Sequence, residues 1–132
     1  MTPTRSAIAG ADRPGDGGFV RALLVEDEFM VSMLVETYLR DLGVDEIVTA
    51  STFAKGLVAA ETEGLSFAIL DVNLNGTMSF PIAARLRERG VPITFQTGYG
   101  RKGVEEAFAD CPVLAKPYTR KELRDALDCL LG

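Results

Sequence analysis

Short apolar segments that favour β-strands alternate with helical patterns from Phe19 onward, and this alternation restricts the possible folds most strongly. The strand-like segments are residues 19–27, 46–50, 66–71, 91–97 and 111–116. Apolar residues at three- and four-residue steps predict helices over residues 31–42, 52–63, 79–89, 101–110 and 119–131. Right-handed crossovers between such units give a parallel sheet covered on both faces. We therefore predict an α/β fold of the (βα)5 type, a doubly wound five-stranded parallel sheet.

The bulk composition fits one soluble domain. The chain has 132 residues, is 47% hydrophobic and carries a net charge of −5, which argues against a nucleic-acid surface. Neither a membrane-length apolar stretch nor a signal pattern is present, so we expect a cytoplasmic protein that contacts no membrane. Residues 1–18 are rich in Gly, Pro and Ala and predict a flexible tail, with the folded domain over residues 19–132.

Two residue types limit the chemistry further. The absence of histidine excludes His-based triads, His-based metal sites and a phosphohistidine. Cys111 and Cys129 have neither metal-ligand nor CxxC spacing, so we expect both to be reduced.

Polar residues stand where four of the expected strands end. Glu26 and Asp27 end the first, Asp71 the third, Thr97 the fourth and Lys116 the fifth. In open parallel sheets, ligands bind outside the carboxyl ends of the strands. We therefore expect these five side chains to lie along one edge.

The chemistry of that edge favours a cation and a phosphoryl group. Carboxylates held close together repel one another, and an all-oxygen ligand set suits Mg²⁺ better than zinc. The main-chain carbonyl of Asn73 is placed to add a ligand. A hydroxyl and an ammonium opposite the acids suit phosphoryl transfer, which needs positioning and charge neutralisation. Asp71, on the central strand, is the natural nucleophile.

Four segments, "LLVEDE", "AILDVNLNG", "ITFQTGYG" and "LAKPY", resemble the signature segments of the receiver domain of two-component response regulators. The resemblance covers nearly all of the chain after residue 18 and implies a flavodoxin-like sheet with strand order 2-1-3-4-5. It implies that Asp71 is the phospho-acceptor. Glu26 and Asp27 then hold Mg²⁺, with Asp27 a direct ligand, and Asn73 contributes its main-chain oxygen.

The resemblance also assigns the phosphoryl contacts. Thr97 hydrogen-bonds one phosphoryl oxygen, Lys116 pairs with another, and the Lys116–Pro117 peptide bond is cis, which costs little before proline. The "FQTGYG" segment is similar to the signature of the FAT GUY group, mostly single-domain regulators of alphaproteobacteria.

The sequence departs from the usual receiver pattern at two places. Glu26-Asp27 replaces the commoner Asp-Asp pair, from which we expect retained but altered Mg²⁺ affinity. Val113 stands where many receivers carry Tyr or Phe, so the usual Thr/aromatic switch is in doubt. Our hypothesis is that phosphorylation instead reorders the loop after Thr97. Its glycines make that loop permissive, and Tyr99 gives it a large side chain.

Several functions compete. The leading one is a signalling switch, not a turnover enzyme, phosphorylated by a sensor histidine kinase or phosphotransfer protein. It then contacts a downstream protein or passes the group on in a phosphorelay. Because the chain ends at Gly132, we expect no DNA-binding or catalytic output domain, unless the chain is a piece of a longer regulator. An Asp-nucleophile phosphohydrolase is disfavoured because Asn73 occupies the position of its general acid.

Two further alternatives remain at this stage. One is a phosphorylation-independent, receiver-like adaptor, which Val113 keeps open. The other is a dinucleotide site, because Gly98, Gly100 and Gly103 spell G-x-G-x-x-G. Its context is poor, since the motif follows the fourth expected strand and no acid stands at the required strand end.

Overall fold

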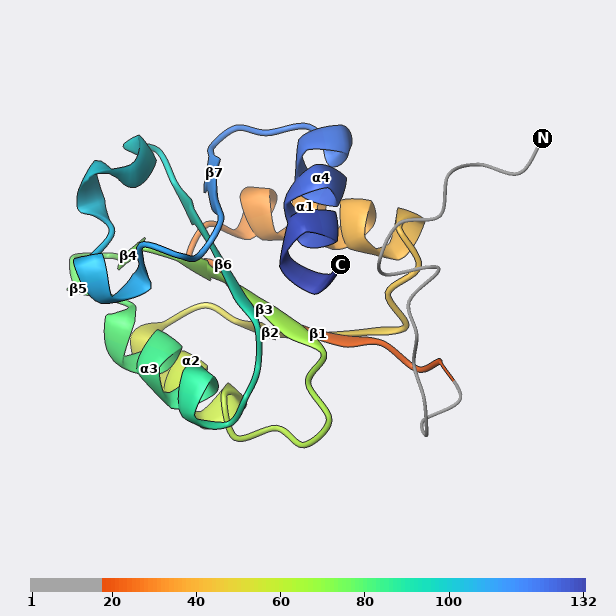
Figure 1. Cartoon of the computed structure of the whole chain (residues 1–132), viewed down its shortest axis with the longest axis horizontal. Helices are drawn as coiled ribbons and strands as arrows, with labels where there is room; N and C mark the ends of the chain where they lie inside the picture. Colours follow the sequence, from red (N-terminus) through yellow and green to blue (C-terminus); the bar gives the residue numbers. More distant parts are fainter. Residues whose placement is uncertain (1–17) are drawn as a thin grey trace.

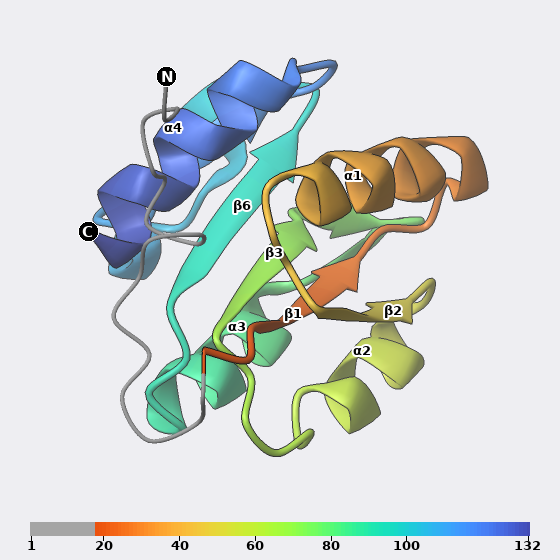
Figure 2. The same ribbon diagram turned by 90° about the vertical axis from the view of Figure 1, so that its right-hand side faces the viewer.

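A computed structural model describes residues 18–132, which form a parallel sheet between two pairs of helices (Figures 1 and 2). The strand order β2-β1-β3-β6-β7 is the predicted 2-1-3-4-5 pattern, since β6 and β7 are its fourth and fifth strands. The bounds are β1 (Arg21–Val25), β2 (Glu46–Ala50), β3 (Phe67–Asp71), β6 (Ile93–Thr97) and β7 (Val113–Ala115). The predicted tail, residues 1–18, lies outside the described residues except for Gly18.

Helices α1 (Phe29–Asp41) and α4 (Arg120–Leu131) cover one face of the sheet, and α2 (Phe53–Ala59) and α3 (Phe80–Glu88) cover the other (Figure 2). The central strand β3 is buried along its whole length. Its side chains alternate between the two cores: Phe67 and Ile69 pack under α1 and α4, and Ala68 and Leu70 under α2 and α3. This two-sided burial explains why the strand reads as a continuous apolar run.

The helix predicted over residues 101–110 is wrong. Two short 3₁₀ turns, η1 (Gly100–Gly103) and η2 (Glu106–Phe108), take its place. Neither turn has a side-chain cap, and glycines at both ends of η1 favour turn over helix. Phe108 anchors the segment, with ring centroids 5.7 Å from Phe80 and 5.6 Å from Phe95.

A hairpin that the sequence did not predict follows β3 directly. Strands β4 (Asn73–Leu74) and β5 (Thr77–Met78) pair in antiparallel fashion. The two turn residues, Asn75 and Gly76, both have positive φ, 51° and 94°, which is the Asn-Gly turn that joins hairpin strands. The side-chain oxygen of Asn73 accepts a hydrogen bond from the Gly76 amide at 2.6 Å, so the chain is fixed immediately beyond Asp71.

The start of α4 is capped by side chains, because Thr119 and Glu122 form a capping box there. Both cysteines are free, Cys111 buried and Cys129 exposed. Among residues 18–132, no helix combines the length and apolar character that crossing a membrane requires.

Candidate functional site

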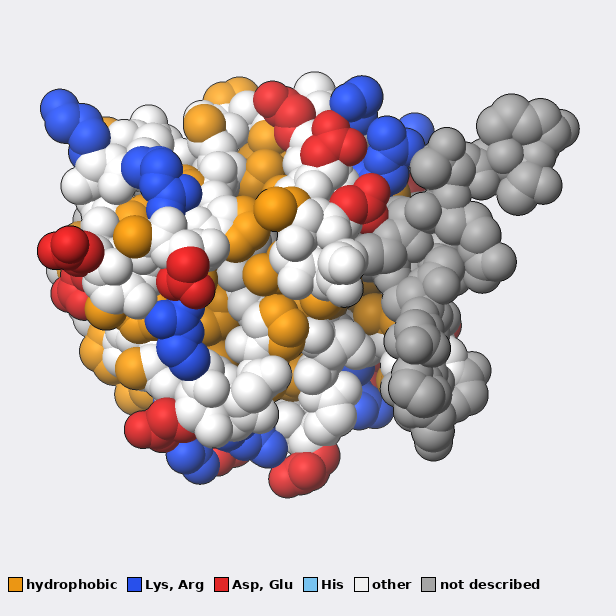
Figure 3. Space-filling view, in the orientation of Figure 1, with side chains coloured by type: hydrophobic (Ala, Val, Ile, Leu, Met, Phe, Trp, Pro, Cys, Tyr) orange, Lys and Arg blue, Asp and Glu red, His pale blue; other side chains and the backbone are white. Residues whose placement is uncertain are grey.

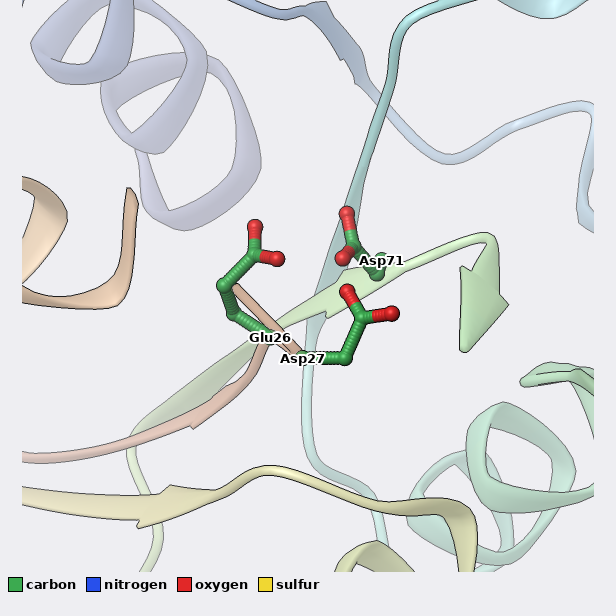
Figure 4. Close-up of side chains that lie close together, drawn as sticks. All are labelled: Glu26, Asp27 and Asp71. Carbon is green, nitrogen blue, oxygen red and sulfur yellow. The ribbon is translucent and has the colours of Figure 1, made fainter. Parts of the chain in front are cut away.

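Three carboxylates converge where β1 and β3 end (Figure 4). Glu26 and Asp27 follow β1, and Asp71 is the last residue of β3, which pairs directly with β1. One oxygen from each of the three side chains lies within 4.8 Å of the others. Glu26 and Asp71 are each only 2% exposed, so the sheet holds two acids in a largely water-free position.

Lys116 brings a positive charge to the same cluster from the end of β7. Its ammonium nitrogen lies 2.9 Å from Asp71 Oδ1 and 3.2 Å from Glu26 Oε1. The Lys116 backbone amide donates to the carbonyl of Thr97 at 2.9 Å, which continues the β6–β7 pairing beyond the last ladder residue. The Lys116–Pro117 bond is cis, as predicted.

The pKa values follow from this confinement. Burial raises the pKa of Glu26 well above its ordinary value, the neighbouring Asp71 raises it further, and Lys116 offsets only part of the effect. Burial also raises the pKa of Asp71, against hydrogen bonds with Glu26 and Lys116 that lower it. For Lys116, burial lowers the pKa, but Asp71 and Glu26 outweigh burial and leave it raised. The metal-free cluster therefore tends to hold a proton, preferentially on Glu26, beside a charged lysine.

The donor set fits a hard divalent cation. All candidate ligands are oxygens, and Asp71 Oδ2 is buried without a hydrogen-bond partner. A buried carboxylate oxygen without a donor is costly, and a cation shared with Asp27 would satisfy it. Carboxylate oxygens, with water completing the shell, are the ligands that Mg²⁺ takes.

Thr97 and Asn73 lie at the same edge but outside the cluster of direct contacts. The Thr97 hydroxyl oxygen accepts a hydrogen bond from the Tyr99 amide at 3.1 Å. Because the Asn73 side chain is engaged with the Gly76 amide, its main-chain oxygen is the atom to consider as a ligand. The roles of both residues stay predictions.

Two residues of this site were missed from the sequence. Gln96 is fully buried in β6, in register with Asp71. Its side-chain nitrogen lies 2.7 Å from Glu26 Oε1 and 3.3 Å from Asp71 Oδ1. The Tyr118 hydroxyl donates to the Gln96 side-chain oxygen. The available signal was an amide within a predicted strand, next to the predicted edge residue Thr97.

The alternative dinucleotide site has little structural support. The G-x-G-x-x-G glycines follow β6, but the segment opens the four-residue 3₁₀ turn η1 rather than the helix whose N-terminus would bind a pyrophosphate.

The family model described as "Response regulator receiver domain" matches residues 22–128. The solution structure of SdrG from Sphingomonas melonis Fr1 is 39% identical, with a TM-score of 0.77, over 86% of this chain and 98% of SdrG. Its BeF3-activated conformation, from Pseudomonas melonis Fr1, is 39% identical, with a TM-score of 0.73, over 85% of this chain and 96% of that one.

A third similar structure is the receiver domain of the sensor histidine kinase PA1611 from Pseudomonas aeruginosa PAO1, with a magnesium ion coordinated in its active-site cleft. It is 26% identical, with a TM-score of 0.74, over 86% of this chain and 98% of that domain. Comparison with curated protein sequences gives no match. The family match over most of the chain agrees with the sheet order and the acidic edge, and the chain belongs to the response regulator receiver domain family.

Proposed function

We propose that this receiver domain accepts a phosphoryl group on Asp71 and signals by a phosphorylation-dependent protein contact or by passing the group on in a phosphorelay. The observation that carries the proposal is that the two carboxylate oxygens of Asp71 have different surroundings. Its Oδ1 is held by Lys116 at 2.9 Å, while its buried Oδ2 has no partner. One carboxylate is thus fixed against a cationic side chain and keeps an oxygen free for a metal.

The chemistry is a substitution at phosphorus. A carboxylate oxygen of Asp71 forms the new O–P bond as the bond to the donor breaks, and the donor's nitrogen or oxygen leaves with its electron pair. Lys116 neutralises charge on the phosphoryl oxygens, and the Thr97 hydroxyl turns from the Tyr99 amide to donate to one of them. Bound Mg²⁺, held by Asp27, Asp71 and the Asn73 carbonyl with Glu26 in support, would supply further charge neutralisation.

The donor would be a sensor histidine kinase or a phosphotransfer protein, and the output a protein partner. SdrG, a similar protein, is described in a BeF3-activated conformation, which supports activation at the acceptor. We extend the proposal to the stand-alone FAT GUY type, with a receiver domain over residues 19–132, a tail before it and a cytoplasmic location.

Nucleic acid is not a proposed partner. On the face drawn in Figure 3, the Lys and Arg side chains lie among Asp and Glu, and the net charge of the chain is −5. Phosphate-backbone binding needs a concentrated positive surface, which this mixed pattern does not resemble.

A switch that accepts a phosphoryl group on its own aspartate is favoured over a turnover phosphohydrolase. An Asp-nucleophile hydrolase needs a general acid for its leaving group, and the amide of Asn73, two residues after Asp71, is too weak an acid for that role. Hydrolysis of a small phosphate ester over many turnovers would reverse this assignment.

Intact mass spectrometry tests the proposal directly. Wild-type protein incubated with acetyl phosphate and Mg²⁺ should gain one phosphoryl group, and Asp71→Asn under the same conditions should gain none. Omitting Mg²⁺ should suppress the adduct in the wild type. No adduct from acetyl phosphate or from a histidine kinase would instead favour a phosphorylation-independent adaptor, which the non-aromatic, half-buried Val113 keeps as the second candidate.

A further inference from the structure

The buried amide of Gln96 makes contacts that its strand position does not require. A primary amide has two N–H donors and one carbonyl acceptor. In this site the nitrogen faces two carboxylates, Glu26 at 2.7 Å and Asp71 at 3.3 Å. One neutral side chain thus bridges the two acids that Lys116 also bridges.

Tyr118 holds the opposite end of that amide. The tyrosine is 7% exposed and packs in the core under α1 and α4, with its hydroxyl donating to the Gln96 oxygen. Burial raises the pKa of Tyr118, so the phenol keeps its proton. If the amide rotated by half a turn, its oxygen would face the two acids, so both of its hydrogen bonds to Glu26 and Asp71 would be lost together.

We propose that Gln96 is a positioning residue of the phospho-acceptor, and that Tyr118 acts on Asp71 only through Gln96. The proposal rests on the function proposed above. The amide and Lys116 together fix Asp71 Oδ1 before the donor arrives, which sets the plane of the carboxylate and turns Oδ2 toward the cation position. Orientation of the nucleophile is one of the main contributions to a transfer that needs little covalent help.

A purely structural role in β6 can be told apart from a positioning role, because the same strand contains a second buried polar residue for comparison. Thr94 is also fully buried, two residues before Gln96, and its hydroxyl donates to the Pro112 carbonyl at 3.0 Å. This hydrogen bond is remote from the acids. Thr94→Val is therefore a matched control that removes a buried polar contact from β6 without touching Asp71.

The main experiment is a double-mutant cycle on Gln96→Met and Tyr118→Phe. The readout is the initial rate of Asp71 phosphorylation by acetyl phosphate at saturating Mg²⁺, with folding checked by circular dichroism. Gln96→Met should lose about tenfold in rate, as expected for losing a hydrogen bond to a charged group. Tyr118→Phe should lose less, and the double variant should match Gln96→Met alone. Thr94→Val should keep the wild-type rate.

Two outcomes would overturn the proposal. One is a wild-type rate for Gln96→Met, and the other is a double variant whose loss is the product of the single losses, since independent sites add in free energy.

A second measurement needs no phosphorylation. In the metal-free wild type, NMR should show two slowly exchanging Gln96 side-chain protons, assigned by their absence in Gln96→Met. They should shift in both Tyr118→Phe and Asp71→Asn. If the chemical shifts of these protons change in neither variant, the positioning role is refuted. If the wild type accepts no phosphoryl group, the proposed function fails, and these spectra still decide the role of Gln96.

Discussion

The carboxyl edge of the sheet has two halves of different construction. At the β1–β3 half, Glu26 and Asp71 are nearly inaccessible and share two donors, Lys116 and Gln96. Beyond β6, residues 98–108 form two short 3₁₀ turns, and Tyr99 is 80% exposed. Within one edge, Asp71 is buried between two donors, while the adjoining loop is more exposed and is held by Phe108 and by hydrogen bonds from Arg87 and Arg101. Such an arrangement lets one half hold the chemistry while the other changes shape.

Phe108 is the aromatic anchor of the loop, and removing its ring should produce the largest effect on stability. Phe108 is 5% exposed and packs against Phe80 and Phe95. Phe108→Ala should lower the free energy of unfolding by about 3–5 kcal/mol, the usual cost of an aromatic-to-alanine cavity. Urea denaturation measures this loss. The exposed Tyr99 gives the control, since Tyr99→Ala should change stability by less than about 0.5 kcal/mol. Equal losses would contradict the comparison.

The acidic half should make the free energy of unfolding depend on pH, which the loop should not. Burial and the neighbouring Asp71 raise the pKa of Glu26 above its ordinary 4.5, so the folded, metal-free protein holds a proton that the unfolded chain releases. That contribution is complete below about pH 4.5 and is lost as pH rises through the higher, folded-state pKa. Each unit by which the pKa is raised corresponds to about 1.4 kcal/mol.

Glu26→Gln tests this by removing the titration. Its stability relative to the wild type should improve steadily between pH 5 and pH 8, by roughly 1–3 kcal/mol, in urea titrations without Mg²⁺. The slope is the diagnostic, because the variant also alters the hydrogen bond from the Glu28 amide by a pH-independent amount. Added Mg²⁺ should flatten the wild-type pH dependence. A constant difference across this range would show that Glu26 holds no extra proton.

The division between the halves also explains what the sequence revealed. The expected strands are largely apolar segments that end on polar residues, so the parallel sheet and the meeting of Glu26, Asp71 and Lys116 were predictable. The strand order came instead from the resemblance to receiver domains. The prediction of a helix over residues 101–110 was wrong. Val104 and Phe108 have helical spacing, but the glycines and the packing of Phe108 against Phe80 and Phe95 favour turns. Gln96 escaped notice because nothing local shows that an amide in a strand faces two acids from other strands.

Two glycines in the loop separate backbone strain from packing. Gly100 has φ +69° and open space around its Cβ position, whereas Gly98 has open space and no positive φ. Gly100→Ala should cost about 1 kcal/mol, because a Cβ is disfavoured in the left-handed region. Gly98→Ala should be neutral or stabilise by about 0.5 kcal/mol through the unfolded chain. Thermal unfolding of the pair measures both, and equal effects would mean that the loop does not hold this conformation.

The smallest effect on global stability, and the one closest to signalling, concerns the loop itself. Val113 cannot act as the inward-turning aromatic of other receivers, so the proposed change at Thr97 would need another path to the surface. The Thr97 hydroxyl holds the Tyr99 amide at 3.1 Å, and turning to a phosphoryl group would release that amide. Hydrogen exchange of residues 98–108 should therefore change when beryllofluoride and Mg²⁺ are added, most strongly at Tyr99, while the buried strand β3 should keep its protection. Thr97→Val removes the acceptor, so its Tyr99 amide should exchange fast in both states. Equal protection of the loop with and without beryllofluoride in the wild type would place the switch elsewhere in the domain.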